Sequence, residues 1–578
     1  MIEKMTKYSF VLMGGSTEKF LEELQNLGVV DITRSSKPID DRSLALMKEI
    51  EEKKNLIGCI GSGRDAHLEE LEAGLGALLR EKAVIEPWGE YDRPALAALG
   101  LGVCHYSVKA DRFDPAWEEQ WAIQKVLEKD GTVWFVVIGG SDGFPLKPLP
   151  APTKSLGELE GQIASAQAGI KEYEAELLSR RSELEGLGAE VSELSAQFGR
   201  HLAALSAETA AEGSLVIFEG YSPCEGDAAL QAELDKMDVV YLAGEAEAAD
   251  NPPIKLRNNW FARQFETLTG MYGMPVYDEW DPTPILAPFF MLFFALCMGD
   301  AGYGLLLIAI AYALKSCKGE GPMGLAKHWR LIRTLGAATL VVGFFLGTFF
   351  GISLADQAWF PDSLKKVLLT GNLGAFPLQM VLALGIGVLH ICLAMVVKTA
   401  LYTKRFGFKE MISTWGWTLL IVGGLAAFIV CSVMHLSADL TKWIIIGIAV
   451  VSALGIFIFN KPGRNPLLNV GAGLWDTYQM ATGVLGDVLS YIRLYALGLA
   501  GGMLGSAFNT LGGMVLGEHP TFQWLFFIII VVFGHALNLA MSCLGAFVHP
   551  LRLTFVEYFK NSGYEGRGRA FNPLRKDK

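Results

Sequence analysis

Long apolar runs dominate the second half of the chain. They follow one another between residues 284 and 560, with short polar connectors between them. A helix needs about 20 consecutive apolar residues to cross the hydrocarbon core of a bilayer. The runs cover residues 284–314, 331–353, 376–401, 412–434, 443–459, 474–516 and 521–557. This pattern predicts a polytopic α-helical membrane domain over residues 284–560.

The charges of the connectors predict how these helices cross the membrane. Lysines and arginines gather in the connectors 315–333, 398–409 and 460–466 and after residue 560, and the positive-inside rule places such segments in the cytoplasm. The N-terminal half shows no cleavable signal, so it is expected to be cytoplasmic as well. A single crossing by residues 284–314 would contradict these two placements.

We therefore expect residues 284–314 to enter the membrane and return as a short hairpin. Its middle is a glycine-rich break that contains a charge, with Gly299, Asp300, Gly302 and Gly304 as the hairpin motif. Irregular backbone is tolerated at this depth only where protein or a water-filled cavity surrounds it. With this hairpin, the chain is predicted to have eight membrane helices and both ends in the cytoplasm.

The last two predicted helices differ from the others. The run 474–516 is longer than one perpendicular crossing requires, so it is expected to be strongly tilted, bent or extended beyond the bilayer. On the last helix, positions projected at about 100° per residue place a set of polar side chains within about 140° of one another. These are His535, Asn538, Ser542, His549, Arg552 and Glu557. A polar stripe on an apolar helix faces protein or water rather than lipid.

Arg493 lies about halfway along the run 474–516. A charge inside a membrane segment is energetically costly, so it indicates a functional site first. Small residues on another side of the same helix indicate a close helix contact that points away from the arginine. These are Gly498, Gly501, Gly502 and Gly505.

Alternative interpretations of the polar residues stay open. Arg493 could pair with a carboxylate such as Asp487 or Glu557, and either arginine could extend its charged end to the membrane interface. The polar side chains of the last helix could also be hydrogen-bonded groups between helices. Each alternative would give these residues a structural role.

The first 283 residues alternate between strand-like and helical stretches. Short strand patterns bounded by turn signals occur near residues 8–13, 133–138 and 215–242. They predict compact α/β lobes.

A heptad pattern of apolar residues extends over about residues 155–205, with Arg180 as its main exception. A charged helix at about residues 43–86 is the expected partner within the chain, and pairing with a second copy is the alternative. Residues 1–283 are therefore predicted to form a cytoplasmic domain with two α/β lobes joined by an antiparallel coiled coil. Residues 561–578 are predicted to form a cytoplasmic basic tail.

Composition and motifs exclude several classes of function. The chain has 578 residues and a formal net charge of −12, which argues against nucleic acid as a partner. Its eight cysteines contain no C-x-x-C pair, as expected in a reduced compartment without a disulfide framework. It has no nucleotide-binding phosphate loop and no H-E-x-x-H motif, and its nine histidines lack metal-ligand spacing. We therefore expect a non-catalytic chain without a cofactor or metal.

Several short stretches together resemble a known family. They are Asn251–Asn258, Phe265–Pro275, Asp281–Pro284, Met298–Gly304, Ser490–Leu497, Gly534–Leu539 and Gly545–Leu553. With these motifs the chain resembles the a/I subunit of rotary V-type and archaeal A-type ATPases, in its prokaryotic form. The resemblance spans essentially the whole chain.

This resemblance implies a stator subunit that faces a rotating proteolipid c-ring (subunit K), each member of which carries one ion-binding carboxylate. Two offset half-channels would carry ions to and from the ring. Arg493 would be the essential arginine that makes the carboxylate release its ion, and Arg552 its companion. The candidate half-channel lining consists of His535, Asn538, Ser542, His549, Glu557, Asp487 and Ser490.

The resemblance also implies partners and a location. The partners would be the peripheral-stalk subunits E and G, the C/d subunit of the central stalk and membrane lipid. The absence of the long eukaryotic insertions favours a prokaryotic plasma membrane. Eukaryotic relatives carry a glutamate at Ser542 and a histidine at Gly501, so the route of the outer half-channel is open here. The choice between H⁺ and Na⁺ is open as well, and a secondary transporter or a purely structural membrane anchor is the alternative function.

Overall fold

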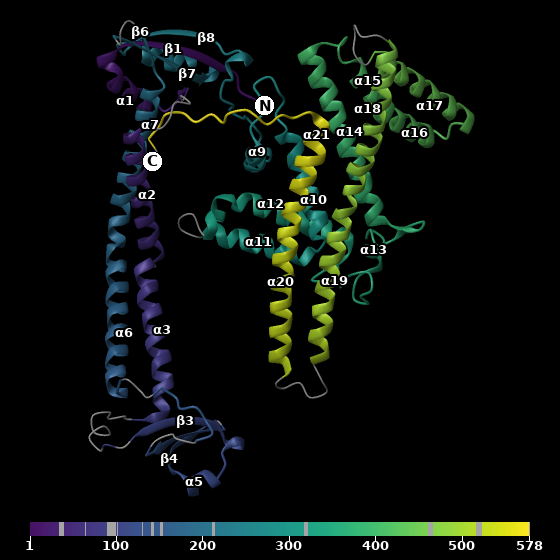
Figure 1. Cartoon of the computed structure of the whole chain (residues 1–578). Helices are drawn as coiled ribbons and strands as arrows, with labels where there is room; N and C mark the ends of the chain where they lie inside the picture. Colours follow the sequence, from purple (N-terminus) through teal and green to yellow (C-terminus); the bar gives the residue numbers. More distant parts are fainter. Residues whose placement is uncertain are drawn as a thin grey trace. The chain divides into compact units, whose positions relative to one another are not determined.

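Figure 1 shows the computed structural model of the chain. It describes residues 1–33, 40–63, 65–89, 100, 102–129, 131–139, 144–150, 154–210, 214–316, 322–459, 466–515 and 523–576. The chain divides into two compact units. Unit 1 contains residues 1–12, 29–33 and 217–573, and unit 2 contains residues 13–28, 34–216 and 574–578. All the long apolar helices therefore belong to unit 1.

Four long helices form most of unit 2. They are α2 (Asp41–Ser62), α3 (Ala66–Ile85), α6 (Leu156–Ser179) and α7 (Leu184–Leu205). Helix α3 lies beside α6, and α2 lies beside α7 (Figure 1). The heptad exception Arg180 begins a short 3-10 turn, Arg180–Glu183, which separates α6 from α7. The interruption in the residue pattern thus coincides with an interruption of the helix.

Polar side chains begin three of these helices. The carboxylate of Asp40 accepts a hydrogen bond from the N–H of Ser43 at the start of α2, and Asp65 does the same for α3. Ser155 begins α6 in a reciprocal arrangement with Glu158. Each such cap stabilises a helix by about 1 kcal/mol, because it satisfies an N–H group that lacks a partner within the helix.

A small antiparallel sheet completes unit 2. Its strands β3 (Val103–Lys109), β4 (Ala122–Lys129) and β5 (Thr132–Ile138) lie in the order β3-β5-β4. Apolar residues of β3 and β5 alternate inward with period two and form a core with Phe144. The strand predicted near residues 133–138 is thus confirmed. The other elements of unit 2 are α1 (Thr17–Leu27), α5 (Ala116–Gln120) and β6 (Glu208–Ala210).

The sheet of unit 1 joins strands from both ends of the N-terminal half. Strands β1 (Met5–Met13), β2 (Asp31–Ile32), β7 (Leu215–Pro223) and β8 (Val240–Glu245) follow the order β2-β7-β1-β8. The strands near residues 8–13 and 215–242 were expected in separate lobes, but the structure places them in one sheet. Pairing between strands so far apart in sequence leaves no local signature in the residue pattern.

Six helices in the described part of the chain are long and apolar enough to cross a membrane. They cover Gly324–Leu346, Leu378–Phe406, Ile412–Val433, Ala438–Ile458, Asn469–Val515 and Gln523–Ser562. Two shorter apolar helices, α10 (Thr283–Met298) and α11 (Ala301–Ser316), precede them. Their junction confirms the predicted break at the hairpin motif, and the count of eight membrane helices remains a prediction.

The individual elements of these segments are as follows. The helices are α12 (Trp329–Leu346), α14 (Leu378–Phe406), α15 (Ile412–Thr418), α16 (Gly424–Val433), α17 (Ala438–Ala453), α18 (Pro466–Ser490), α19 (Ile492–Val515), α20 (Gln523–Arg552) and α21 (Phe559–Ser562). Three π-helical turns cover Leu419–Gly423, Leu454–Ile458 and Leu553–Tyr558. The smaller elements of unit 1 are α8 (Asp227–Leu234), α9 (Glu266–Tyr272), α13 (Asp362–Lys365), β9 (Thr348–Phe349), β10 (Ile352–Ser353), β11 (Asn372–Leu373) and β12 (Phe376–Pro377).

Helix α10 is the centre of the membrane domain. Its residues Ala287, Phe290, Phe293 and Met298 are all 0% exposed. It packs against α12, α19 and α20. A helix that is apolar on every side is stable only when other elements surround it. The hairpin is therefore covered by protein, as its irregular backbone requires.

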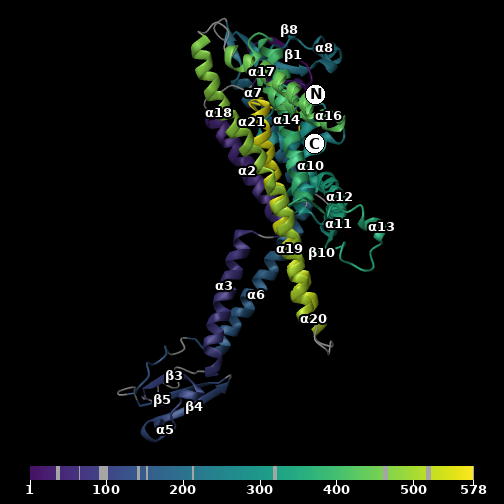
Figure 2. The same cartoon turned by 90° about the vertical axis from the view of Figure 1, so that its right-hand side faces the viewer.

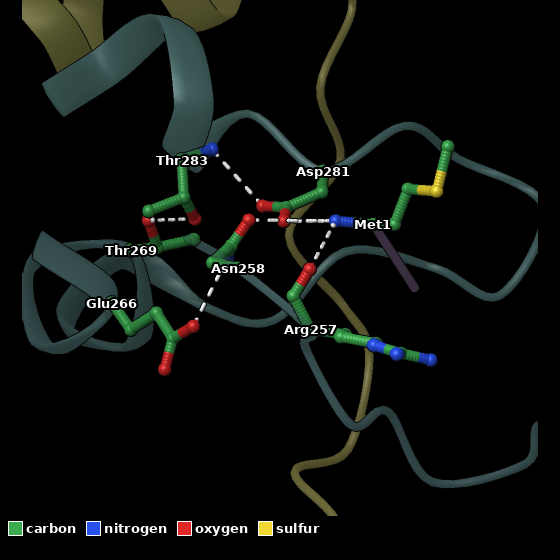
Figure 3. A network of polar contacts seen from close by, with 7 residues as sticks. All are labelled: Met1, Arg257, Asn258, Glu266, Thr269, Asp281 and Thr283. Carbon is green, nitrogen blue, oxygen red and sulfur yellow. Dashed lines mark hydrogen bonds and ion pairs between the residues drawn. The ribbon is translucent and has the colours of Figure 1, made fainter. Parts of the chain in front are cut away.

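The start of α10 is tied to the N-terminal lobe of unit 1 (Figure 3). The side chain of Asp281 is 0% exposed, and its Oδ2 lies 3.0 Å from the α-ammonium of Met1. Its Oδ1 accepts a hydrogen bond of 3.0 Å from the N–H of Thr283, the first residue of α10. Nearby, burial raises the pKa of the Glu266 carboxyl, and the side-chain amide of Asn258 partly opposes this rise. One buried carboxylate thus joins the beginning of β1 to the beginning of the first apolar helix.

The segment 563–573, here named the C-terminal strap, is hydrogen-bonded to the same lobe. The N–H of Gly568 donates to the carbonyl of Met274 at 2.8 Å, and the N–H of Phe571 donates to Ile254 at 2.9 Å. At its end, the N–H of Asn572 donates to the carboxylate of Asp31 at 2.9 Å. This part of the predicted basic tail therefore connects the end of the last membrane helix to the sheet.

Replacing Gly568 with alanine tests the strap. A Cβ atom there would overlap the backbone carbonyl of Pro275, whereas one at Gly270 would come no closer than 3.9 Å to its neighbour. We expect Gly568→Ala to destabilise the attachment by about 1–3 kcal/mol and to accelerate tryptic cleavage after Arg567 and Arg569. Gly270→Ala is the matched control. Equal cleavage rates in the two variants would contradict the tight attachment.

Candidate functional site

Arg493 lies one residue after the start of α19. A turn at Tyr491 separates α19 from α18, so the helix of the long run 474–516 is interrupted at this point. The side chain of Arg493 is half-buried, and its Nη1 is buried without a hydrogen-bond partner among the described residues. Its charge acts on Cys297 of α10 and on His549 of α20. It forms no ion pair within the described residues, so the predicted alternative of pairing with Asp487 or Glu557 is not what the structure has.

Helices α19 and α20 lie side by side and extend past the short helices α11 and α12 (Figures 1 and 2). The second arginine, Arg552, is exposed at the last residue of α20. A π-helical turn follows it directly, after Pro550 has removed one backbone N–H from the helix. The two arginines therefore have different surroundings, because Arg493 is half-buried whereas Arg552 is exposed.

A hydrogen-bonded group that we name the Tyr303 network connects α11, α19 and α20. The hydroxyl of Tyr303 lies 2.8 Å from Nδ1 of His535 and accepts a hydrogen bond of 2.8 Å from Nδ2 of Asn538. Asn538 is 0% exposed, and its Oδ1 accepts a hydrogen bond of 3.2 Å from Ser542. The interhelical interpretation therefore describes the contacts of His535 and Asn538, whereas the hydrogen bond of Ser542 stays within α20.

Helix α19 contributes the remaining members of this network. Nδ2 of Asn538 also donates to the carbonyl of Gly501 at 2.8 Å. Oδ1 of Asn509 lies 3.0 Å from Nε2 of His535. Nδ2 of Asn509 donates to the carbonyl of Phe350 at 2.7 Å. A Cβ atom at Gly501 would lie 3.0 Å from the hydroxyl of Ser542. Close contact between α19 and α20 thus depends on a glycine, as predicted for Gly501.

The other predicted seam glycines contact different partners. A Cβ atom at Gly498 would lie 2.6 Å from the carbonyl of Leu296 in α10, and one at Gly505 would lie 3.1 Å from Gly351. Gly502 has open space at this position. The glycine face of α19 therefore contacts α10, α20 and the turn at Gly351 and also borders a cavity. Helical spacing suggested a single seam with one helix.

Asp300 organises the hairpin motif. Its Oδ1 accepts hydrogen bonds from the N–H groups of Gly302, Tyr303 and Phe350 at 2.8, 3.3 and 2.8 Å. Its Oδ2 accepts one from Gly351 at 2.7 Å. The side chain begins α11 and also holds the turn after β9. Asp300 is 1% exposed and its acceptor positions are occupied, so its role in this structure is to shape the backbone.

The three motif glycines permit close approaches around Asp300. Gly299 ends α10 with a left-handed φ of 60°, which favours glycine. A Cβ atom at Gly302 would overlap the ring of Phe350, and one at Gly304 would overlap the backbone of Leu340 in α12. The motif therefore brings the backbones of α11 and α12 into direct contact and leaves room for the ring of Phe350 against α11.

A second polar group, here named the Asp487 cluster, joins the end of α18 to the turn after α20. Asp487 lies 3.3 Å from Nζ of Lys560 and accepts a hydrogen bond of 2.8 Å from Asn561. Glu557 is 3% exposed, and its Oε2 has no hydrogen-bond partner among the described residues. The hydroxyl of Ser490 donates to the carbonyl of Gly486 at 3.1 Å, one turn earlier in α18. The predicted residues Asp487, Ser490 and Glu557 thus lie in the same region, where the end of α18 meets the turn after α20.

The predicted site residues therefore form two groups with the arginines between them. Along α19, Arg493 precedes Asn509 of the Tyr303 network by about 24 Å at 1.5 Å per residue. Asp487 lies on the other side of the turn at Tyr491, near the end of α18. Along α20 and its continuation, His549 and Arg552 lie between Ser542 and Glu557. Nδ1 of His549 is buried and has no partner among the described residues.

Known proteins resemble this chain over parts of both halves. The model of the V-type ATPase 116 kDa subunit family matches residues 158–324 and 478–576. V-type ATP synthase subunit I 1 of Treponema pallidum is 25% identical, over 100% of this chain and 100% of its own length. These matches support membership of the a/I subunit family of V-type and A-type ATPases. Together with the six long apolar helices of the described residues, they support a multi-pass membrane protein of this family.

Two archaeal family members are more similar over part of the chain. A-type ATP synthase subunit I of Methanocaldococcus jannaschii is 30% identical over 60% of this chain and 52% of its own length. The subunit I of Pyrococcus abyssi is 34% identical over 57% of this chain and 48% of its own length. The chain thus spans about half the length of these two relatives.

Sequence reasoning missed a cavity beside the glycine face of α19. The cavity has a volume of about 370 Å³ and lies between α19, the end of α10 and the segment 346–383. Tyr495, Gly498, Gly502 and Ser506 line it from α19. None of the polar stripe residues of α20 lines it. Its far wall comes from an irregular connector whose path carries no periodic signal.

Sequence reasoning also missed Tyr303 and Asn509 as site residues. Tyr303 lies inside the hairpin motif, so its position between two glycines was an available signal. Asn509 is an amide in an otherwise small and apolar stretch, and an isolated amide in a membrane helix indicates an interhelical hydrogen bond. Both residues form two hydrogen bonds in the Tyr303 network.

Asp300→Asn tests the hairpin. The amide would direct an N–H group at a backbone N–H, so buried hydrogen bonds to a charged acceptor would be lost. We expect a loss of stability of about 2 kcal/mol or more, measured as a lower thermal midpoint of the purified protein. Asp356→Asn, an exposed carboxylate in the following loop, is expected to change stability by less than about 0.5 kcal/mol. A wild-type midpoint for Asp300→Asn would show that these hydrogen bonds contribute little.

Proposed function

We propose that this chain is the ion-conducting stator subunit of a V/A-type rotary ATPase. The names of its relatives, ATP synthase subunit I, support membership of such a complex. The observation that carries the mechanism is the pair of polar groups, the Tyr303 network and the Asp487 cluster, on either side of Arg493. Ions would pass from one group to the other only by way of a rotating c-ring (subunit K).

The unpartnered guanidinium group supports this role for Arg493. A guanidinium stays charged under all physiological conditions, and its attraction to a carboxylate is strong where water is scarce. The side chain is half-buried and forms no ion pair among the described residues, so its charge would be left for a group on another protein of the complex. A carboxylate of the c-ring that arrives there would release its ion, and the positive charge would prevent direct ion flow between the two groups.

We assign the Asp487 cluster to the cytoplasmic half-channel and the Tyr303 network to the outer one. Basic connectors flank the first group, as the positive-inside rule expects of the cytoplasmic side. In the second group, Gly501 and Ser542 are direct neighbours. These are the positions at which eukaryotic relatives carry a histidine and a glutamate, so the outer route here would depend on the neutral groups of Tyr303, His535 and Asn538.

The soluble part would serve as the stator arm. We propose that the pairs α2–α7 and α3–α6 form an antiparallel coiled coil, with α/β lobes at its ends that bind the peripheral-stalk subunits E and G and the C/d subunit of the central stalk. The chain itself would be non-catalytic, with residues 1–283 and 561–578 on the cytoplasmic side of a prokaryotic plasma membrane. Residues 284–560 would contribute eight membrane helices, including the α10–α11 hairpin.

Arg493→Ala in the complete complex, reconstituted into vesicles, tests this function. We expect ATP-driven ion uptake to fall at least about tenfold, because a charge-assisted interaction of about 2 kcal/mol is lost. Arg330→Ala removes an exposed positive charge at the start of α12 and is expected to leave uptake unchanged.

The alternative functions give different results in the same experiment. Near wild-type uptake by assembled Arg493→Ala complexes would contradict ion translocation through this site. A purely structural membrane anchor predicts this result. A secondary transporter predicts ion flux by the isolated chain, in the absence of the other subunits.

A further inference from the structure

His390 occupies the middle of the membrane domain on α14. It is 0% exposed, and its Nδ1 lies 2.9 Å from the hydroxyl of Tyr491. Its Nε2 has no hydrogen-bond partner within the described residues. A buried imidazole of this kind requires a structural or functional reason, because burying a polar atom without a partner costs free energy.

Aromatic rings enclose this imidazole on both faces. Phe289 of α10 lies 4.3 Å away at an interplanar angle of 27°, and Tyr558 lies 4.4 Å away at 7°. Tyr558 is the last residue of the π-helical turn that follows Arg552. The ring of Phe293 contacts both His390 and Tyr491 edge-on. The orientation of the imidazole is therefore determined by three elements.

Tyr491 forms the break between α18 and α19, two residues before Arg493. It is 0% exposed. Its ring packs on Gly387 of α14, where a Cβ atom would overlap it. Its hydroxyl reaches His390 one turn further along α14. The point at which α19 begins is thus attached to α14 by a glycine contact and by one hydrogen bond.

We propose that His390 is a positioning residue for the two arginines. Through Tyr491 it determines where α19 begins and hence the position of Arg493. Through the stacked ring of Tyr558 it supports the π-helical turn next to Arg552. This inference rests on the proposed ion-translocation function, because it assigns His390 a role only in placing the charges of that site.

The test uses His390→Phe and Tyr491→Phe in the complete complex in vesicles. Each variant keeps an aromatic ring and removes the hydrogen bond, leaving the other partner unsatisfied. The double variant removes both partners, which is close to neutral for stability. We measure ATP-driven ion uptake per ATP hydrolysed and passive ion leak in assembled complexes. A loss of folded protein lowers uptake and hydrolysis together and leaves their ratio unchanged, so the ratio reports positioning.

We expect the uptake-to-hydrolysis ratio to fall about fivefold in each single variant, because about 1 kcal/mol from one hydrogen bond corresponds to this factor. The passive ion leak is expected to rise. The double variant is expected to assemble like the wild type and to retain the low ratio. Thr399→Val is the matched control, since Thr399 lies on the same helix as His390 and the change removes a buried hydrogen bond of 2.6 Å from α14 to Thr418 of α15. Its ratio is expected to equal that of the wild type.

Two results would overturn the positioning role. One is a wild-type ratio in the assembled double variant, which would show that the bond serves stability alone. The other is an equal fall of the ratio in Thr399→Val. Arg493→Ala distinguishes this failure from failure of the proposed function. If Arg493→Ala abolishes uptake while the double variant is normal, only the role of His390 is contradicted, whereas normal uptake by Arg493→Ala contradicts the function itself.

Discussion

A buried guanidinium nitrogen without a partner among the described residues is the constraint on which the membrane domain depends. An uncompensated charge in a low-dielectric interior is strongly destabilising, so a chain normally supplies a carboxylate. Asp300 accepts four backbone hydrogen bonds, and Asp487 contacts Lys560 and Asn561. Glu557 keeps one buried oxygen without a partner among the described residues, yet it forms no ion pair with Arg493 there. The described part of the chain therefore supplies no carboxylate partner to Arg493, as the proposed pairing with a carboxylate on another protein requires.

Keeping such a charge in place requires a rigid surrounding. The core of α10 supplies apolar packing on one side, and the hairpin motif brings the backbones of α11 and α12 close together. The glycines of α19 allow α10, α20 and the turn near Gly351 to approach the same helix. Close packing of this kind has few alternative arrangements, because small shifts produce overlaps that side chains cannot relieve. The polar groups on either side of Arg493 are consequently held at a fixed separation along α19 and α20.

The sequence predicted features that have a local period or a strong local cost. Apolar runs predicted the membrane segments, the charge in the glycine-rich motif predicted the break between α10 and α11, and Arg180 coincided with the turn after α6. Features that depend on contacts between distant segments were not predictable. The pairing of β1 with β8, the link from Asp487 to Asn561 and the bond from His390 to Tyr491 each join residues far apart in sequence. The contacts of the seam glycines were likewise hidden, because helical spacing identifies a face but not what covers it.

The connections at the lobe of unit 1 complete the mechanical argument. Asp281 joins the first apolar helix to the start of β1, and the C-terminal strap joins the end of the last one to the same sheet through Ile254 and Asp31. Both joints consist of buried or backbone hydrogen bonds, so neither behaves as a flexible linker. A force on the arginine-bearing helix α20 would therefore reach the sheet through bonded backbone rather than through the surrounding lipid. The proposed stator role requires this property, because Arg493 would have to stay in place while the carboxylates of the ring move past it.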